Sequence, residues 1–346
     1  MGKGIACKII KIILLSVVFV LTAGCNYDNQ TAGKADAKET SGKVAWLAYW
    51  DLDAGVKDLQ RLGNKLDKLS YFGAYFDASD RIFIPRELSD KRKELKAKKG
   101  KYETYLTIVN DKQNADESVI MKDTEVLRRA FASSAAMDRH IDAIVALTLQ
   151  GKYDGIEIDY ERIWSDEQVA RSFAIFVDKL FLKARENNLK LRVVLEPGTP
   201  FSYANLPQGP EYVVMFYNLY GLHSEPGPKA NKDFIERTAQ QMRALRGGAS
   251  AAFATGGCLW GDNGKRALLT EAEAKTLAVT FDSKPKRDAA SQCLVFTYKD
   301  SGVTYQVWYA DVETINYWIG IAKEQGVNNF SLWRLGGNIE INKINE

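Results

Sequence analysis

From residue 43 onward, the chain alternates short apolar runs with longer amphipathic stretches. The short runs are rich in β-branched and aromatic residues and predict eight strands, at residues 44–50, 69–76, 105–109, 155–160, 191–196, 212–217, 251–255 and 329–333. Near-continuous apolar strands that alternate with helices are typical of a parallel sheet, and eight such units predict an α/β fold, the (β/α)8 TIM barrel. The alternative is an open doubly wound sheet, for which the expected GxGxxG motif does not follow the first strand.

The clearest helical patterns flank the fourth predicted strand. One runs over residues 124–150 and ends at Gly151, a residue suited to a helix C-terminus. The other covers residues 167–187, where apolar residues recur at helical spacing: Val169, Phe173, Phe176, Leu180 and Ala184.

One interval, residues 257–311, breaks the alternation between the seventh and eighth strands. It contains a helical stretch at 270–279 and two β-rich runs, 292–298 and 303–309, joined by a turn. We predict a small α+β insertion on the strand-seven loop. In a barrel that loop lies at the C-terminal face, where active sites are found.

The N-terminus has the features of a targeting segment. Lys3, Lys8 and Lys11 precede a short apolar run, and small residues precede Cys25. The pattern resembles a bacterial lipoprotein signal, with Cys25 as the lipidated residue. An uncleaved anchor and an ordinary secretory signal are the alternatives. We therefore expect an exported lipoprotein, held on the extracytoplasmic side of the bacterial cell envelope, with this organisation: signal peptide 1–24, flexible tether 25–42 and barrel 43–346.

Composition narrows the function classes. The net charge is only +3 and is dispersed, so nothing supports nucleic-acid binding. The only histidines are His140 and His223, with no His cluster and no CxxC pair, so a zinc site, a Ser-His-Asp triad and a Cys-His dyad are poorly supplied, and we expect no metal and no cofactor. Outside the N-terminal segment, Cys258 and Cys293 either pair or remain buried free thiols. We expect a monomer.

Residues 153–163 carry the most informative chemistry, with carboxylates at Asp154, Glu157, Asp159 and Glu161. The last three have a spacing of two residues, so a strand points them to one face. A solvent-facing strand has the same alternation. However, no basic residue is interleaved, and repulsion together with burial raises carboxyl pKa values, as acid–base catalysis requires.

This run, Asp154-Gly-Ile-Glu157-Ile-Asp159-Tyr-Glu161, resembles the DxxDxDxE signature of glycoside hydrolase family 18. Three later stretches match in order. Met215-Phe-Tyr217-Asn218 resembles the strand-six MxYD motif, 296–311 resembles the insertion hairpin of the bacterial spore-germination and cortex-lytic branch, and 331–336 resembles the strand-eight segment with its tryptophan, Trp333. The resemblance covers roughly residues 43–340. It implies a (β/α)8 barrel, the fold on which this family is built.

The resemblance implies a retaining, substrate-assisted mechanism, in which the nucleophile is the acetamido oxygen of the sugar. Glu161 would be the general acid and base, and Asp159 would hold the acetamido N–H. Glu157 would tune Asp159 by sharing a proton with it, and Tyr217 would donate its hydroxyl to the acetamido oxygen. Trp333 would form the floor under the sugar.

Two positions depart from the family pattern, and two weaker candidates are added from strand ends. Glu157 replaces an Asp and reaches one methylene further, and Asn218 replaces an Asp and loses its charge. Trp50, at the end of the first strand, either stacks on a sugar or packs in the core. Asn110, at the end of the third, either lines the cleft and binds substrate or is a turn residue.

The leading function is hydrolysis of β-1,4 bonds next to N-acetylglucosamine. Peptidoglycan is the favoured glycan because the insertion resembles the cortex-lytic branch, and chitin or N-glycan oligosaccharides are the runner-up. A catalytically inactive, carbohydrate-binding lipoprotein is the competing class, but such proteins usually lack the acid at the position of Glu161. A solute-binding lipoprotein is a third possibility.

Overall fold

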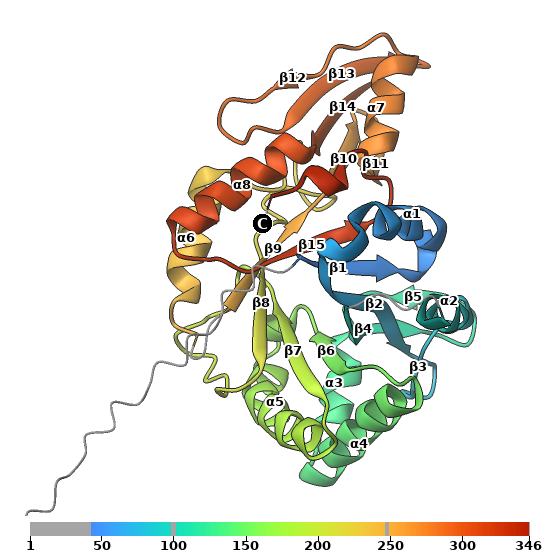
Figure 1. The fold of residues 1–346 in the computed structure, drawn as a ribbon, viewed down its shortest axis with the longest axis vertical. Coiled ribbons are helices and arrows are strands. Elements are labelled where there is room, and N and C mark those ends of the chain that lie inside the picture. Colours follow the sequence, from blue (N-terminus) through green and yellow to red (C-terminus); the bar gives the residue numbers. More distant parts are fainter. Residues whose placement is uncertain (1–42, 98–101, 246–248, 346) are drawn as a thin grey trace, which may run out of the picture. The chain divides into compact units, whose positions relative to one another are not determined.

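The computed structural model describes residues 43–97, 102–245 and 249–345. Eight parallel strands form the central sheet: β1 (Lys43–Ala48), β2 (Leu66–Phe76), β4 (Glu103–Gln113), β6 (Gly155–Asp159), β7 (Lys190–Leu195), β8 (Glu211–Met215), β9 (Ala249–Ala254) and β15 (Phe330–Leu335). Their order is β2-β1-β15-β9-β8-β7-β6-β4, and β2 also pairs with β4, which closes the barrel (Figure 1). The predicted (β/α)8 barrel is confirmed, and each predicted strand overlaps one barrel strand. The predicted signal peptide, tether and Cys25 lie outside the described residues.

Helices connect the barrel strands: α1 (Leu52–Leu62), α2 (Arg86–Ala97), α3 (Thr124–Ala130), α4 (Ser134–Gln150), α5 (Glu167–Glu186), α6 (Lys232–Met242) and α8 (Val312–Glu324). The helix expected over residues 124–150 is two helices, because Ser133 caps α4 by accepting a hydrogen bond from the backbone N–H of Ala136. The 167–187 prediction matches α5, which buries Val169, Phe173, Phe176, Leu180 and Ala184. Two short strands, β3 (Ile82–Phe83) and β5 (Val119–Ile120), pair antiparallel with β2 and β4.

The insertion after β9 is a five-stranded antiparallel sheet with one helix, as predicted in kind (Figure 1). Its elements are β10 (Gly256–Gly261), β11 (Arg266–Leu269), α7 (Glu271–Thr280), β12 (Lys286–Arg287), β13 (Leu294–Asp300) and β14 (Val303–Ala310). Ser301 and Gly302 both have positive φ, as a two-residue hairpin requires. β10 was not predicted, because its glycine-rich sequence is poor in strand formers; Gly257 is required there, since a Cβ would lie 1.8 Å from the carbonyl oxygen of Trp308.

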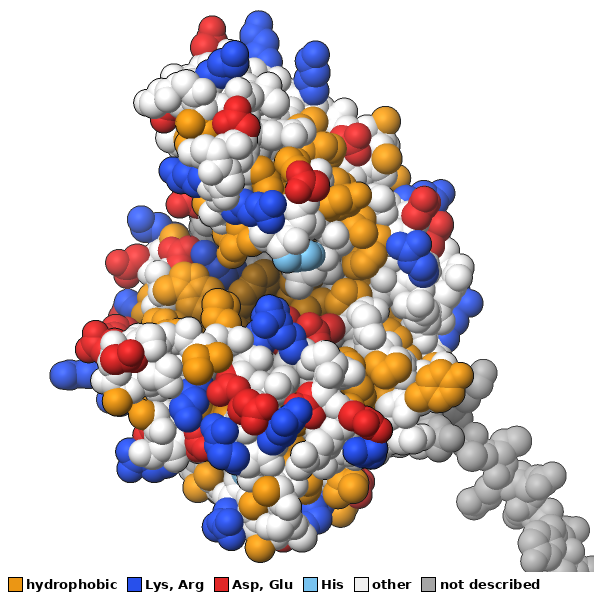
Figure 2. Space-filling model, turned by 180° about the vertical axis from the view of Figure 1, so that it is seen from behind, with side chains coloured by type: hydrophobic (Ala, Val, Ile, Leu, Met, Phe, Trp, Pro, Cys, Tyr) orange, Lys and Arg blue, Asp and Glu red, His pale blue; other side chains and the backbone are white. Residues whose placement is uncertain are grey.

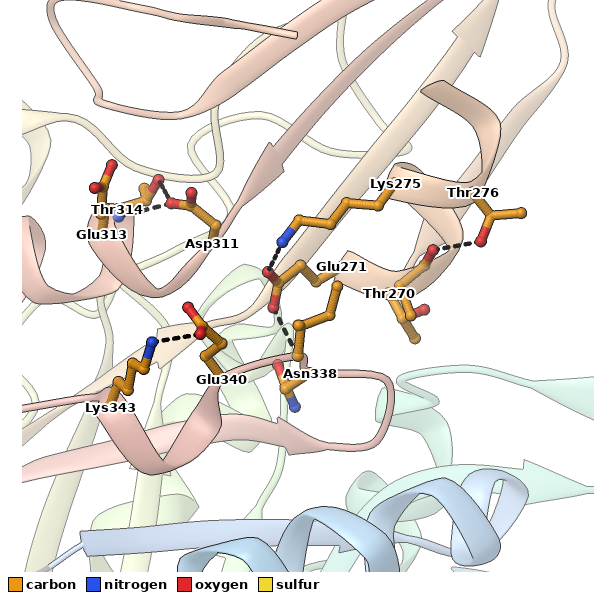
Figure 3. A network of polar contacts seen from close by, with 12 residues as sticks. Thr270, Glu271, Lys275, Thr276, Asp311, Glu313, Thr314, Asn338, Glu340 and Lys343 are labelled. Carbon is orange, nitrogen blue, oxygen red and sulfur yellow. Dashed lines mark hydrogen bonds and ion pairs between the residues drawn. The ribbon is translucent and has the colours of Figure 1, made fainter. Parts of the chain in front are cut away.

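Polar contacts fix the insertion to loops at the carboxyl ends of the barrel strands. The buried Glu271 accepts a hydrogen bond from the Ile339 N–H (3.0 Å). It also pairs with Lys275 (3.0 Å), as Figure 3 shows. Ile339 follows β15. The indole N–H of Trp260 donates to the carbonyl oxygens of Gly221 (3.2 Å) and Ser224 (3.0 Å), in the loop after β8. The insertion therefore borders the face at which the barrel's functional loops lie.

The two cysteines of the insertion are buried free thiols. Cys258 on β10 is in register with Trp308 of β14, whereas Cys293 precedes Leu294 on the opposite side of β14. Two strand spacings put their Cα atoms about 9–10 Å apart or more, beyond the reach of a disulfide. Burial raises the pKa of both thiols, that of Cys293 to about 12. Of the two alternatives for these cysteines, a disulfide or buried free thiols, the structure shows the buried free thiols.

Two general features of the described residues bear on function. No helix among them is long and apolar enough to cross a membrane. Nor do these residues contain a group of three or more His, Cys, Asp or Glu side chains arranged to hold a metal ion.

Candidate active site

β6 carries the acidic motif into the interior of the barrel. All five of its residues are buried, and it pairs with β4 on one side and β7 on the other. Gly155 at its start is required by packing, because a Cβ there would lie 2.3 Å from the ring of Tyr105. Glu157 and Asp159 are almost completely buried, whereas the side chain of Glu161, two residues beyond the strand, is 17% exposed. The same-face acids thus run from the barrel interior to its rim.

Glu157 is surrounded by hydrogen-bond donors. Its carboxylate accepts from the guanidinium of Arg192 (2.6 Å), the indole of Trp46 (2.5 Å) and the hydroxyls of Thr107 (2.7 Å) and Ser70 (3.0 Å). Arg192 lies directly beside Glu157 in the β6–β7 register, and both side chains are fully buried. This differs from the predicted proton-sharing contact with Asp159, because every partner of Glu157 is a donor. The four hydrogen bonds tie the Glu157 side chain to the strands around it.

Asp159 has the opposite environment. Its Oδ1 is buried and has no hydrogen-bond partner. Burial, with the charges of Glu161 and Glu157, raises the pKa of Asp159 well above its usual range. Tyr217 follows β8 and is buried near the same acids; burial and the charge of Asp159 raise the pKa of its hydroxyl. The pocket therefore contains a buried carboxyl group and a phenol hydroxyl that is protonated at any physiological pH.

Glu161 is held from two sides. The side chain of Asn110 binds the backbone of Glu161. Its amide oxygen accepts a hydrogen bond from the Glu161 N–H (2.9 Å), and its amide nitrogen donates one to the Glu161 carbonyl oxygen (3.0 Å). Asn110 is 1% exposed, so it positions Glu161 rather than lining the cleft as a substrate-binding residue. The side chain of Glu161 forms an ion pair with Lys122, in the turn that follows β5.

Two more carboxyl groups lie near Glu161. Burial and the Glu161 charge raise the pKa of Asp111, on β4, against the hydrogen bond from the Lys122 N–H. The same two causes raise the pKa of Glu196, after β7, against the hydrogen bond from the Arg162 N–H (2.8 Å). Sequence reasoning missed Asp111 and Lys122. Asp111 follows Asn110 at a recognisable strand end, but nothing in the loop sequence marks Lys122 as a neighbour of Glu161.

Aromatic rings cluster around Trp333. The partly buried Trp333 on β15 packs against Phe72 (ring centroids 4.7 Å apart), Trp46 (5.9 Å) and Trp50 (6.3 Å). Trp50 is 49% exposed, beside a hollow of about 530 Å³ formed by residues 49–53 and by α2. This exposure rules out the core alternative for Trp50, and stacking on a sugar stays a prediction. Figure 2 shows a hollow with hydrophobic side chains at its bottom on the face seen there, below the insertion.

Asn218 lies in the loop after β8 and is exposed. It has a left-handed backbone (φ 71°), which Asn tolerates better than most residues. Its side-chain amide makes only a 3.9 Å contact with the sulfur of Met215, so the amide remains available to a ligand.

Comparisons with known proteins agree with this geometry. No family model matches the chain. A Bacillus subtilis protein named uncharacterized glycosylase YvbX is 23% identical over 260 residues, which is 70% of this chain and 74% of the relative. Among solved structures, a chitinase from Chromobacterium violaceum superposes with a TM-score of 0.73 at 16% identity, over 88% of this chain and 96% of that one.

Two further structures are similar. The spore cortex-lytic enzyme SleL of Bacillus cereus has a TM-score of 0.70 at 17% identity, over 88% of this chain and 72% of its own. A class V chitinase of Nicotiana tobaccum, in complex with NAG4, has a TM-score of 0.67 at 14% identity, over 87% and 97%. The chain thus shares its (β/α)8 barrel fold with these structures. Its acidic strand, pocket aromatics and insertion are thus carried on a barrel that is found in glycan-cleaving enzymes.

Proposed function

We propose that the protein is a retaining, substrate-assisted glycoside hydrolase that cleaves β-1,4 bonds next to N-acetylglucosamine. The observation that carries this proposal is the buried Oδ1 of Asp159, which has no hydrogen-bond partner among the described residues and whose carboxyl group interacts electrostatically with the hydroxyl of Tyr217. A buried polar group left unpaired costs roughly 1–3 kcal/mol, and a substrate N–H in the pocket would remove that cost.

The chemistry follows from the positions of these groups. Glu161 gives its proton to the glycosidic oxygen as the C1–O bond breaks, and the acetamido carbonyl oxygen bonds to C1, forming an oxazolinium ion. Asp159 accepts the acetamido N–H, and Tyr217 donates its hydroxyl to the acetamido oxygen. Water then attacks C1 as the bond from C1 to the acetamido oxygen breaks, and a proton of this water returns to Glu161. The acetamide is restored, and the two inversions leave the configuration at C1 retained.

The two acids are spaced for separate tasks. They are two residues apart, about 6–7 Å along an extended chain, so the acid reaches the glycosidic oxygen while Asp159 reaches the acetamide. Burial raises the pKa of Asp159 in the free protein, whereas the acetamido N–H and the positive charge of the intermediate both favour its carboxylate form, so Asp159 interacts more strongly with the intermediate than with an empty site. Trp333 supplies the apolar floor on which the sugar ring packs.

For the glycan, peptidoglycan is favoured over chitin and N-glycan oligosaccharides. The support is the insertion hairpin, present here as β13 and β14, and the similarity to a structure named as a spore cortex-lytic enzyme. The similarity to chitinases, one of them in complex with NAG4, supports an N-acetylglucosamine-containing glycan in either case.

Hydrolysis by the purified protein tests the proposal. Wild type, Glu161→Gln and the control Glu167→Gln, a carboxylate 83% exposed on α5, are incubated with N-acetylglucosamine oligomers and with peptidoglycan. We expect wild type and Glu167→Gln to release fragments whose new reducing ends are first in the β configuration, and Glu161→Gln to lose more than about 100-fold in rate. The inactive carbohydrate-binding alternative wins if wild type and Glu161→Gln bind the oligomers equally and cleave none.

We also propose that the mature protein is a lipoprotein at the extracytoplasmic face of the membrane, anchored through Cys25. The support is the signal-like sequence that precedes this residue. Labelling of growing cells with radioactive palmitate should mark wild type and leave Cys25→Ala unmarked. Equal labelling of the two proteins would reject the anchor without bearing on the hydrolase.

A further inference from the structure

The ion pair between Lys122 and Glu161 conflicts with the proposed role of Glu161. A general acid must hold a proton when the glycosidic bond breaks. The ammonium of Lys122 instead lies against that carboxyl group in an ion pair, which a proton on Glu161 would break. Both side chains are partly exposed, 27% for Lys122 and 17% for Glu161, so solvent and a ligand can reach the pair.

The backbone of Lys122 is anchored independently of its side chain. Its N–H donates to Asp111 (2.7 Å), and the preceding β5 is in register with β4, with Ile120 opposite Lys112. Lys122 itself has a left-handed backbone, with φ 57°. The flexible four-carbon stem can therefore move the ammonium by several Å while the turn keeps its conformation.

The ammonium has other partners within reach. The titratable groups that interact electrostatically with Glu161 come from each neighbouring element: Asp111 on β4, Lys122 after β5, Asp159 on β6, Glu196 after β7 and Tyr217 after β8. The charge of Lys122 already acts on Asp111 and Glu196. Moving away from Glu161 therefore costs the Lys122 ammonium little electrostatic free energy, because it remains close to Asp111 and Glu196.

The surface next to Lys122 suits a glycan. Val119, Ile120 and Met121 directly precede it and are 56%, 46% and 63% exposed. Three consecutive exposed apolar side chains are uncommon on a free surface, and the C–H face of a sugar ring is a natural cover for them. A glycan that packs on this turn would approach the Lys122–Glu161 pair directly.

We propose that Lys122 is a displaceable counter-ion of Glu161: it pairs with the acid in the free protein, and a bound glycan moves it toward Asp111 and Glu196. Lys122 is thus a positioning residue that couples substrate binding to the protonation of Glu161. This inference rests on the proposed hydrolase function. It adds a step that the function alone does not require.

The test compares pH profiles. Lys122→Gln removes the charge, Lys122→Arg keeps it, and Lys112→Gln is the matched control, since Lys112 lies on the same hairpin and pairs with Asp80 (2.6 Å). The alkaline limb of kcat/KM reports the acid in the free protein, and that of kcat reports it in the complex. We expect Lys122→Gln to move the kcat/KM limb up by about one pH unit and to leave the kcat limb in place. Lys122→Arg and Lys112→Gln should follow wild type in both.

The inference is overturned if the kcat/KM limb of Lys122→Gln coincides with that of wild type, or if both limbs move together. A second readout does not depend on turnover. In carboxyl 13C NMR, with Glu161→Gln to assign the signal, an N-acetylglucosamine oligomer should move the titration of Glu161 to higher pH in wild type but not in Lys122→Gln. If this difference is seen in a protein that cleaves no glycan, the displaceable counter-ion is supported and the hydrolase function is rejected. If the protein cleaves glycans but shows no such difference, the hydrolase function is supported and the counter-ion is rejected.

Discussion

His140 lies on α4, where its ring stacks on Phe76 (centroids 5.5 Å apart) and Phe176 (5.6 Å). Its Nε2 is 2.8 Å from the hydroxyl of Tyr160, the residue that follows β6. Burial lowers the pKa of His140 from 6.5 to about 4. Nothing in the proposed mechanism uses this histidine, so its protonation should affect stability alone.

The sign and size of the effect follow from linkage. Above about pH 6.5 the imidazole is neutral in both the folded and unfolded chain, and the full stability is present. Between about pH 6.5 and 4 the unfolded chain takes up a proton that the folded chain does not, so stability falls as the pH falls. At about 1.4 kcal/mol per pH unit, the loss of unfolding free energy from His140 is about 3 kcal/mol near pH 4.

Urea unfolding at several values between about pH 7.5 and 4 measures this loss. Because carboxyl groups also titrate in this range, the comparison is with His140→Phe, which keeps the ring packing but cannot titrate. We expect His140→Phe to be less stable than wild type at neutral pH, since the Tyr160 hydroxyl loses its partner, and to lose about 3 kcal/mol less on acidification. His223→Gln, which alters the exposed second histidine, should follow wild type. Parallel curves for wild type and His140→Phe would refute the reasoning.

Two other substitutions test the site's framework. Arg192→Met leaves the carboxyl group of Glu157 buried without its cation and should lower the unfolding free energy by about 3–5 kcal/mol. The control Arg171→Met breaks an exposed ion pair on α5 and should lower it by at most about 1 kcal/mol. Equal losses of the two variants in urea unfolding would contradict a stabilising role for the Arg192–Glu157 pair. Asn110→Ala removes both hydrogen bonds to the backbone of Glu161. On N-acetylglucosamine oligomers, kcat should fall by up to about 100-fold with little change in KM. An unchanged kcat in a folded variant would show that these two hydrogen bonds are not needed for catalysis.

The barrel could be predicted because its strands are buried on both faces, so apolar runs mark them. Element ends were less accurate, for local reasons. The first strand was expected to reach Trp50 but ends at Ala48, because residues Tyr49–Asp51 form a 3-10 turn that brings Trp50 to the surface. The hairpin of β10 and β11 was missed because its first strand is glycine-rich and its second is only four residues long.

For the site, the alternation of side chains along a strand predicted correctly that Glu157 and Asp159 share the barrel interior. It could not predict the side-chain partners, which come from distant parts of the chain. Arg192 is 35 residues from Glu157, and Lys122 is 39 residues from Glu161. Asn110 was recognised as a strand-end residue, but its clamp on a backbone 51 residues away depends on the β4–β6 pairing and on the bend after β6.

The contrasting environments of the two interior acids have a simple cause in the strand register. Glu157 lies opposite Thr107 on β4 and Arg192 on β7, and both neighbours donate hydrogen bonds to it. Asp159 lies two residues further along, opposite Val109, which has no donor to offer. Glu157 stands where the family that the motif resembles has Asp, and its side chain is one methylene longer. This length suits Arg192, because a shorter acid would leave the buried guanidinium further from its partner. The unpaired Oδ1 of Asp159 is therefore explained by its neighbours: no donor among the described residues satisfies it, which leaves it free for the proposed contact with a substrate N–H.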